Sequence, residues 1–226
     1  MRQFAAAAIV FTILAITSAS LAAASCNPGR NSQLGNWFDG WYKTPPSGVC
    51  YTGTLSNILV YQPYVLSADV TAWVMVANNA TGSYGQIGWL QQAGARYNFT
   101  ESSTTGGGFQ QRLPSASAIG SSHYFKVTYS IGVFTYYIDG SSVDTDSAPN
   151  FGGCVADNYG ELTNLANQMP GGASDHELFE STQVRRSDTG NWSYMDGTTD
   201  NQRPSSWGNT KASSTRDEIW EILCFV

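Results

Sequence analysis

The chain has 226 residues, with 11 Lys and Arg against 17 Asp and Glu, and a formal net charge of −6 at pH 7. This acidic balance argues against binding to nucleic acids and to anionic membranes, because both require basic protein surfaces. Charged residues make up 12% of the chain, whereas it contains 7 Trp and 12 Tyr. A surface of neutral polar and aromatic residues is typical of an exported β-protein and is compatible with contact to sugars.

The first 24 residues have the features of a secretory signal peptide. Arg2 precedes a long run of apolar and small residues, and Ala22-Ala23-Ala24 has the small-x-small form that signal peptidase needs. An uncleaved membrane anchor is the alternative, since residues 4–21 are just long enough to span a bilayer. No second apolar segment follows. We therefore expect residues 25–226 to form one soluble, secreted domain that has no membrane contact after cleavage.

The mature chain contains four cysteines, which predict two disulfides in an oxidising compartment. Three pairings are possible, and we favour Cys26–Cys50 together with Cys154–Cys224. A zinc site is disfavoured, because no two cysteines have the short spacing that metal ligands usually show.

Strand patterns dominate from residue 55 onward, after an irregular segment at 25–50 that Pro45-Pro46 and Ser47-Gly48 interrupt. The first four predicted strands are 55–60, 70–76, 87–91 and 96–101. In the second of these, Val70, Ala72, Val74 and Val76 share one face. The other face carries Thr71, Trp73 and Met75. These residues are not typical of a solvent-exposed face, so this face is either covered by other parts of the protein or binds a ligand.

The stretch HYFKVTYSIGVFTYYIDGSSV at 123–143 predicts a hairpin that turns at Gly132 and a third strand after Asp139-Gly140. Residues 155–169 fit either a helix or a strand. Further strands are predicted at 179–184 and 217–226, on either side of a polar segment that is studded with aromatic residues. Many short strands separated by turns predict an all-β sandwich or jelly roll with little helix.

The stretch at 123–143 resembles a hairpin of concanavalin-A-like sandwiches, a group with laminin-G-like and pentraxin-like members. The chain as a whole, with its GQIGWLQ and QMPGG segments, is also similar to uncharacterised secreted bacterial proteins. The resemblance implies a concanavalin-A-like antiparallel β-sandwich over residues 25–226. It also implies a concave sheet face, which this fold often uses to bind glycans. Some relatives of the fold bind calcium, and others are glycoside hydrolases or polysaccharide lyases.

The strongest candidate for catalysis is the pair Asp217 and Glu221, which share one face of the terminal strand. Laminarinase-type relatives carry both catalytic carboxylates on one strand in an E-x-D-x-E pattern, and a retaining mechanism needs the two carboxyls about 5–5.5 Å apart. Here Ile219 replaces the central acid, so the charge that would adjust the pKa values of the neighbouring carboxyls is missing. A solvent-exposed terminal strand therefore explains these residues better than catalysis does.

No cofactor is predicted. Calcium is a minor alternative, because acidic side chains that flank turns offer the hard oxygen ligands that it prefers. These side chains are Asp139, Asp144, Asp146, Asp196 and Asp200. Turn formation explains the same residues without a metal.

Aromatic side chains provide the remaining candidate site, because a sugar ring stacks on Trp and Tyr. The predicted ligand-binding residues are Tyr84, Trp89, Trp192, Tyr194 and Trp207. For Trp73 we favour core packing. The sequence thus predicts a non-catalytic carbohydrate-binding protein whose partner is an extracellular or cell-wall glycan. A glycan-cleaving enzyme that uses Asp217 and Glu221 and an exported structural or protein-interaction module are the alternatives.

Overall fold

The computed structural model describes residues 33–92, 94–105, 108–200 and 206–222. These residues form two packed β-sheets, and they contain no helix. No helix of the described residues is long and apolar enough to cross a membrane. The predicted all-β sandwich is confirmed.

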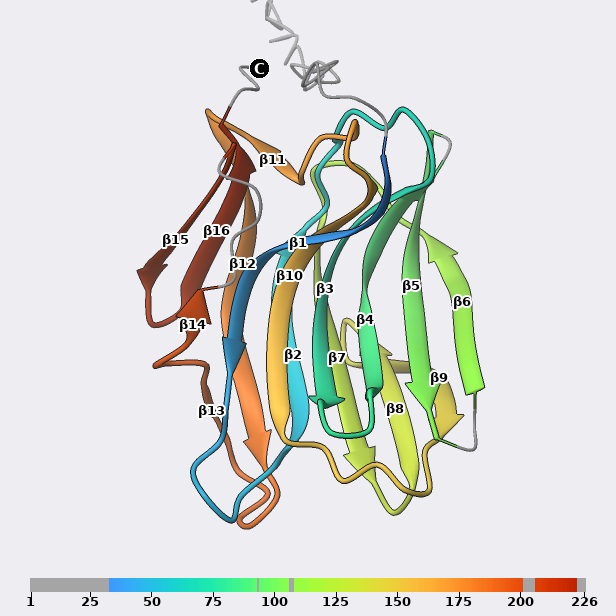
Figure 1. Cartoon of the computed structure of the whole chain (residues 1–226), viewed down its shortest axis with the longest axis vertical. Helices are drawn as coiled ribbons and strands as arrows, with labels where there is room; N and C mark the ends of the chain where they lie inside the picture. Colours follow the sequence, from blue (N-terminus) through green and yellow to red (C-terminus); the bar gives the residue numbers. More distant parts are fainter. Residues whose placement is uncertain (1–32, 93, 106–107, 201–205, 223–226) are drawn as a thin grey trace, which may run out of the picture.

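The first sheet has seven strands and lies toward the viewer in Figure 1. Its strands, in spatial order, are β14 (Thr199–Asp200), β1 (Leu34–Lys43), β10 (Val155–Asn164), β3 (Asp69–Asn78), β4 (Ser83–Gln92), β5 (Ala95–Thr104) and β6 (Gly108–Ala116). All of its pairings are antiparallel. Strands that are distant in sequence meet in its centre, where β10 pairs with both β1 and β3.

The second sheet has nine strands and lies behind the first. Its path runs through β15 (Trp207–Ser213), β16 (Arg216–Glu221), β11 (Gly171–Gly172), β12 (Asp175–Arg186), β2 (Tyr51–Leu59), β7 (Ser122–Ser130), β8 (Val133–Ile138) and β9 (Ser141–Ser147). The short strand β13 (Trp192–Tyr194) pairs with β12. The pairing of β11 with β16 is parallel, and the other pairings are antiparallel.

The hydrophobic core fills the space between the two sheets. Alternation along the strands places every second residue in this space. The predicted inward face of β3 is confirmed, since its four aliphatic residues, Val70, Ala72, Val74 and Val76, are fully buried. Phe125 and Val127 face them from β7, with Phe134 and Tyr136 on β8.

The hairpin at 123–143 also forms as predicted, with two tight turns. Ile131 and Gly132 both have positive φ, at 48° and 77°, and Asp139 and Gly140 repeat this pattern at 50° and 84°. Two consecutive positive φ angles suit the right-handed twist of the flanking strands, and glycine at the second position adopts this conformation without strain.

Three segments have a different secondary structure from the one predicted. The segment 25–50 contains the ten-residue strand β1, which the nearby prolines obscured. The ambiguous segment 155–169 begins with strand β10. The strand predicted at 96–101 is longer than expected, because β5 continues to Thr104, and β6 follows at Gly108.

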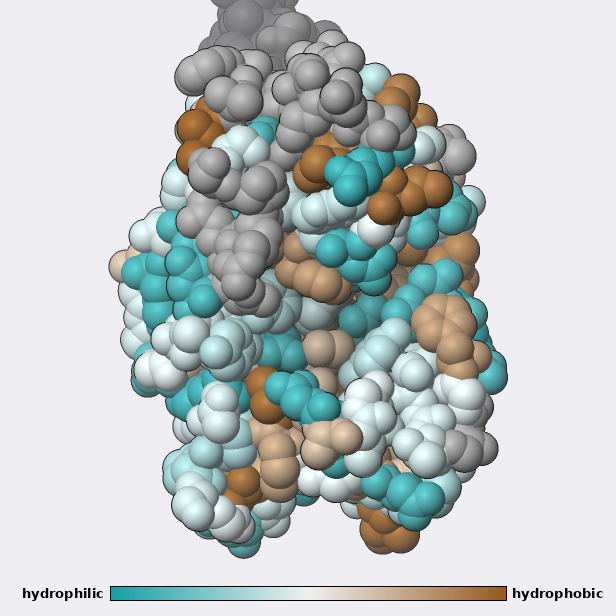
Figure 2. All heavy atoms as spheres, in the orientation of Figure 1, coloured by the Kyte–Doolittle hydropathy of each residue, from teal (hydrophilic) through white to brown (hydrophobic). Residues whose placement is uncertain are grey.

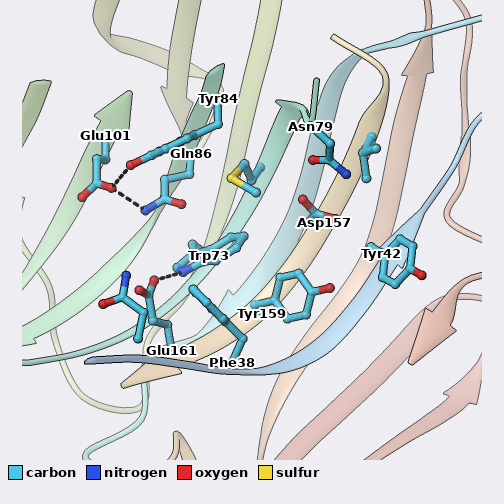
Figure 3. Close-up of a pocket in the computed structure, with 13 residues that line it drawn as sticks. Phe38, Tyr42, Trp73, Asn79, Tyr84, Gln86, Glu101, Asp157, Tyr159 and Glu161 are labelled. Atoms are coloured by element: carbon cyan, nitrogen blue, oxygen red, sulfur yellow. Dashed lines mark hydrogen bonds between the residues drawn. The ribbon is translucent and has the colours of Figure 1, made fainter. Parts of the chain in front are cut away.

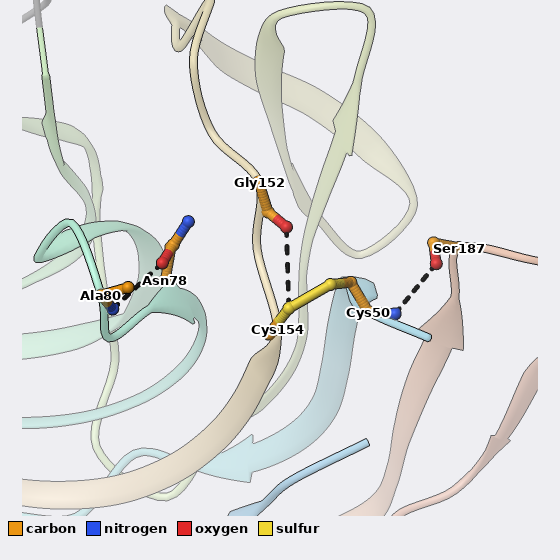
Figure 4. The surroundings of a disulfide bond; sticks show 6 residues. All are labelled: Cys50, Asn78, Ala80, Gly152, Cys154 and Ser187. Carbon is orange, nitrogen blue, oxygen red and sulfur yellow. Dashed lines mark hydrogen bonds between the residues drawn. A yellow bond between two sulfur atoms is a disulfide. The ribbon is translucent and has the colours of Figure 1, made fainter. Parts of the chain in front are cut away.

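The disulfide pairing also differs from the prediction. Cys50 is bonded to Cys154, so the favoured Cys26–Cys50 and Cys154–Cys224 pairs are wrong (Figure 4). The bond joins the chain just before β2 to the chain just before β10, and so ties one sheet to the other across 104 residues of sequence. The backbone N–H of Cys50 also donates to Ser187 Oγ at 3.0 Å. Cys26 and Cys224 lie outside the described residues, as does the predicted signal peptide.

Candidate active site

A pocket of about 470 Å³ lies on the outer face of the seven-stranded sheet. Figure 2 views this face, where hydrophobic and hydrophilic residues are intermixed. Five neighbouring strands, β1, β10, β3, β4 and β5, supply most of its lining (Figure 3). The lining residues are Asn36, Phe38, Tyr42, Trp73, Met75, Asn79, Tyr84, Gln86, Glu101, Val155, Asp157, Tyr159 and Glu161.

The two-residue period of the strands explains why these side chains meet. On β10, Asp157, Tyr159 and Glu161 point into the pocket, whereas the intervening Asn158 and the buried Leu162 face the core. On β3, Trp73 and Met75 point outward. The face of β3 that looked unlike a solvent face in the sequence is therefore the floor of this pocket.

Three aromatic rings form a rigid part of the floor. Trp73 and Tyr159 are direct neighbours on β3 and β10, with ring centroids 5.2 Å apart in an edge-to-face arrangement. Phe38 on β1 packs edge-to-face against both, at 6.3 Å from Trp73 and 6.0 Å from Tyr159. Such pairs stabilise one another beyond simple area burial. Trp73 thus packs against other side chains, as expected, but it does so at the pocket and outside the core between the sheets.

Glu161 is the first acidic group of the pocket. Its Oε2 accepts a hydrogen bond of 2.9 Å from the indole N–H of Trp73. Burial is the main cause of a rise in the pKa of Glu161 to about 7; the hydrogen bond from Trp73 opposes this rise, and the negative charges of Glu101 and Asp69 add to it. A carboxyl in this state holds a proton in weakly acidic solution and can donate it.

Glu101 is the second acidic group, and three side chains donate hydrogen bonds to it. Its Oε1 accepts from the Tyr84 hydroxyl at 2.7 Å and from Gln86 Nε2 at 3.1 Å, and its Oε2 accepts from Gln111 Nε2 at 2.7 Å. Burial raises the pKa of Glu101, while the bonds from Tyr84 and Gln111 oppose that rise by stabilising the ionised form. Burial and the neighbouring carboxylate also raise the pKa of Tyr84, so its hydroxyl stays protonated.

Asp157 is the third acidic group and has a different environment. It is 5% exposed and lies between Tyr42 of β1 and Met75 of β3 in the sheet register. Burial alone raises its pKa to about 8. No hydrogen bond to its carboxyl comes from the residues that the structure describes.

The pocket therefore combines carboxyl groups whose environments differ. Burial raises the pKa of both Glu161 and Glu101, but Glu101 accepts hydrogen bonds from three side chains, and those from Tyr84 and Gln111 oppose the rise by favouring its ionised form. Two carboxyls in different protonation states are the usual arrangement for general acid and general base catalysis in one site. One N–H of the Gln86 amide donates a hydrogen bond to Glu101, and the other N–H can donate to a ligand.

The sequence-predicted ligand-binding residues do not gather in one place. Tyr84 lines the pocket. Trp89 and Trp207 are fully buried, and the indole N–H of Trp89 donates to Leu59 O and Glu177 Oε1. Their selection as sugar platforms is wrong, because a buried ring offers no face to a ligand. Trp192 and Tyr194 lie on β13, which pairs with β12 of the other sheet.

The alternative catalytic pair also faces the interior. Asp217 and Glu221 are both buried, on either side of the buried Ile219. Asp217 Oδ1 accepts a hydrogen bond from Lys211 and its Oδ2 accepts one from Asn158, each at 2.8 Å, so both carboxyl oxygens have a partner. The expectation of a solvent-exposed terminal strand is wrong as well, because β16 pairs with β15 on one side and with β12 on the other.

The acidic residues suggested for calcium make other contacts. Asp144 and Asp146 both bind Arg112 Nη1, at 2.9 Å and 2.6 Å. Asp139 binds the ring of His123 at 2.8 Å. Over the described ranges, no group of three or more His, Cys, Asp or Glu side chains is placed to hold a metal ion.

Sequence reasoning missed Glu101, Asp157 and Glu161. The alternation Asp157-x-Tyr159-x-Glu161 would have placed all three side chains on one face if 155–169 had been assigned to a strand. Glu101 is the last residue of the strand predicted at 96–101, and no local pattern links it to Glu161, 60 positions further along the chain.

Comparison with known proteins gives structural neighbours but no sequence relatives. The sequence matches no protein-family profile and no curated protein sequence. The structure is similar to scytalido-glutamic peptidase in complex with a peptide-based transition state analogue, with a TM-score of 0.65 and 14% identity over 84% of this chain and 100% of that chain. It is also similar to SCP-B, a member of the eqolisin family of peptidases, in complex with the tripeptide Ala-Ile-His. That match has a TM-score of 0.61 and 14% identity, with the same coverage.

Glycan-active proteins resemble a smaller part of the fold. LamA from Z. galactanivorans, in complex with laminaritriose and laminaritetraose, matches with a TM-score of 0.35 and 13% identity over 53% of this chain and 58% of that chain. The three peptidase structures each match 84% of this chain. The prediction of a non-catalytic carbohydrate-binding protein is corrected accordingly, because the fold is shared with enzymes over 84% of this chain.

Proposed function

We propose that the protein is a hydrolase that cleaves peptide bonds by general acid and general base catalysis in acidic solution. The observation that carries the proposal is one pocket with two carboxyl groups: Glu161, whose pKa is raised to about 7 chiefly by burial, and Glu101, whose rise in pKa on burial is opposed by hydrogen bonds from Tyr84 and Gln111. Support for a peptide substrate comes from the glutamic peptidases that share the fold, two of which hold peptide ligands. These are similar folds at low identity, so the roles below rest on this chain's own residues.

In the proposed reaction, Glu101 acts as the base. Its carboxylate accepts a proton from a water molecule while the water oxygen forms a bond to the carbonyl carbon of the peptide. The free N–H of Gln86 donates to the carbonyl oxygen as negative charge develops there. Tyr84 and Gln86 also orient Glu101 through the bonds that they donate to it.

Glu161 acts as the acid in the second half of the reaction. Its protonated carboxyl transfers a proton to the amide nitrogen as the carbon–nitrogen bond breaks, which releases a neutral amine. Glu101 then returns its proton to solvent, and Glu161 regains one. Trp73 positions Glu161 through the bond from its indole N–H. Because Glu161 must be protonated, activity falls as the pH rises through about 7.

Glycan cleavage is the second candidate, and one observation favours it. Phe38, which is partly exposed, lines the same pocket as the two carboxyls and packs against the buried rings of Trp73 and Tyr159. Sugar rings stack on such side chains, and most glycosidases use a pair of carboxyl groups as acid and base or as acid and nucleophile. A glycoside hydrolase or polysaccharide lyase would act here on an extracellular glycan.

The test is hydrolysis of a denatured-protein and peptide panel, with a β-glucan and polysaccharide panel in parallel, from pH 3 to pH 8. The variants are Glu161→Gln and Glu101→Gln, and the matched control is Glu180→Gln, an exposed residue on β12. Each pocket variant should lower kcat by about 10²–10⁴-fold, whereas the control should retain wild-type activity. Cleavage of glycans alone would replace the peptidase proposal with the second candidate. Full activity in Glu161→Gln would overturn both.

We also infer that the protein is exported and works in an extracellular medium. The Cys50–Cys154 disulfide is compatible with an oxidising compartment. The predicted signal peptide at 1–24 would direct the export. Amino-terminal sequencing of protein recovered from culture medium should start near residue 25, and recovery of a chain that starts at Met1 would contradict cleavage.

A further inference from the structure

Asp157 stands apart from the two carboxyls that the proposed reaction uses. It lies on the same strand as Glu161 but four residues away, which separates their α-carbons by about 13 Å. It is almost fully buried, and no side chain or backbone group of the described residues donates a hydrogen bond to it. Burial of an unpaired carboxyl is costly, whereas buried charges in proteins are normally paired. Within the described residues, the Asp157 carboxyl is therefore a pocket-lining group that is available to pair with a ligand.

The surroundings of Asp157 determine the kind of partner that fits. Tyr42 and Met75 are its direct neighbours on the adjacent strands, and Val155 and Tyr159 flank it on β10. In Figure 3 the carboxyl lies among the labelled Asn79, Tyr42 and Tyr159. Met75 and Val155 offer apolar surface for an alkyl chain, and the partly exposed ring of Tyr42 is of the kind that attracts a cation.

The charge of the pocket agrees with this partner. Its lining contains three carboxyl groups and no Lys, Arg or His among the described residues. A site with these features attracts cations and repels anions.

We propose that Asp157 forms a specificity subsite for a cationic side chain, Lys or Arg, of a peptide substrate. This inference rests on the proposed function, because it assumes a peptide ligand in the pocket. The alkyl part of the side chain packs against Met75 and Val155, and its charged end pairs with the Asp157 carboxyl. Since an extended peptide rises about 3.3 Å per residue, and a Lys side chain reaches about 6 Å, the cationic residue lies roughly two to four positions from the cleaved bond.

Binding of the cation has a measurable consequence for protons. In weakly acidic solution the free carboxyl of Asp157 carries a proton, because burial raises its pKa to about 8. Pairing with an ammonium or guanidinium group favours the carboxylate, so the proton passes to the buffer when the peptide binds. A neutral peptide would leave that proton in place.

The experiment measures peptide binding to the Glu161→Gln variant, so that turnover does not interfere. Two hexapeptides are compared by titration calorimetry at pH 6, one with Lys and one with norleucine at the same position, each in two buffers of different ionisation enthalpy. The position is scanned along the peptide, and an Arg series is run in parallel. We expect the cationic peptide at its best position to bind at least about tenfold more tightly and to release about one proton.

Three further variants on the same background complete the test. Asp157→Asn should abolish both the preference and the proton release, and Asp157→Glu should keep the preference. Asp188→Asn, an exposed acid that pairs with Arg186, should change neither and serves as the control. Equal binding of Lys and norleucine peptides at every position, or a preference that survives Asp157→Asn, would overturn the subsite.

The two proposals fail in different ways. If Glu161→Gln still hydrolyses peptides, the reaction assignment is wrong, while a cation preference that requires Asp157 still stands. If hydrolysis requires Glu161 but binding is indifferent to the cation, only the subsite is wrong.

Discussion

Asp157 should also make the stability of the protein depend on pH, and the effect can be isolated by the substitution Asp157→Asn. The folded protein holds the proton of this carboxyl up to a pKa of about 8, whereas an ordinary Asp has a value of 3.8. Between these two values the folded state binds more protons than the unfolded state, so the free energy of unfolding falls as the pH rises. The contribution is fully present below about pH 4 and is lost as the pH passes through about 8.

The magnitude follows from the difference in pKa. Four units at about 1.36 kcal/mol each amount to about 5–6 kcal/mol between pH 4 and pH 8.5. This value is an upper limit, because water and small movements of the chain relax a buried charge. Asparagine has nearly the same shape and does not ionise, so the Asp157→Asn variant should lose this part of the pH dependence.

The assay is urea unfolding of the wild type and of Asp157→Asn at a series of pH values from 4 to 8.5. We expect the stability difference between the variant and the wild type to grow by several kcal/mol in favour of the variant across this range. Asp188→Asn serves as the control and should not share this trend, since its carboxyl is exposed and its pKa is lowered by Arg186. If the free energy of unfolding of Asp157→Asn and that of the wild type changed in parallel with pH, the reasoning would be refuted.

Two further predictions concern the pocket and the disulfide. Trp73→Phe removes the hydrogen bond that lowers the pKa of Glu161, so the alkaline limb of activity should move above pH 7 and kcat should fall about tenfold; an unchanged pH profile would show that Trp73 does not tune the acid. The Cys50–Cys154 bond joins positions 104 residues apart and restricts the unfolded chain. Replacing both cysteines by Ala removes this restriction and should lower the free energy of unfolding by about 3–5 kcal/mol. Urea denaturation with and without reductant checks this, and a reductant effect as large in the double variant as in the wild type would contradict it.

Local patterns in the sequence were sufficient to predict most of the fold. Alternation at 70–76 and the turn residues Gly132 and Gly140 determine strands and turns through neighbours a few positions away. The strand at 155–164 was ambiguous because its Leu162 also fits a helical spacing with Leu165 and Met169. Its pairing with β1, more than 100 residues earlier in the chain, resolves the choice, and no local pattern carries that information.

The site was harder to predict than the fold, for the same physical reason. Glu101 and Glu161 lie on strands that are not adjacent in the sheet, and their electrostatic interaction exists only once β3 and β4 are placed between them. The aromatic residues posed a related problem. Trp73 and Trp89 have similar strand contexts, yet one lines the pocket and the other fills the core, because a shift of one residue reverses the face.

Strand β10 thus separates two kinds of selective constraint along a single stretch of chain. Its odd-numbered positions, 157, 159 and 161, supply the chemistry of the pocket, and its even-numbered positions 158, 160 and 162 maintain the packing between the sheets. A change of substrate could therefore evolve by substitution at every second residue without any alteration of the core, and without the insertions that remodel loop-based sites. A saturation library restricted to those outward positions would explore new specificities while the packing between the sheets stays unchanged.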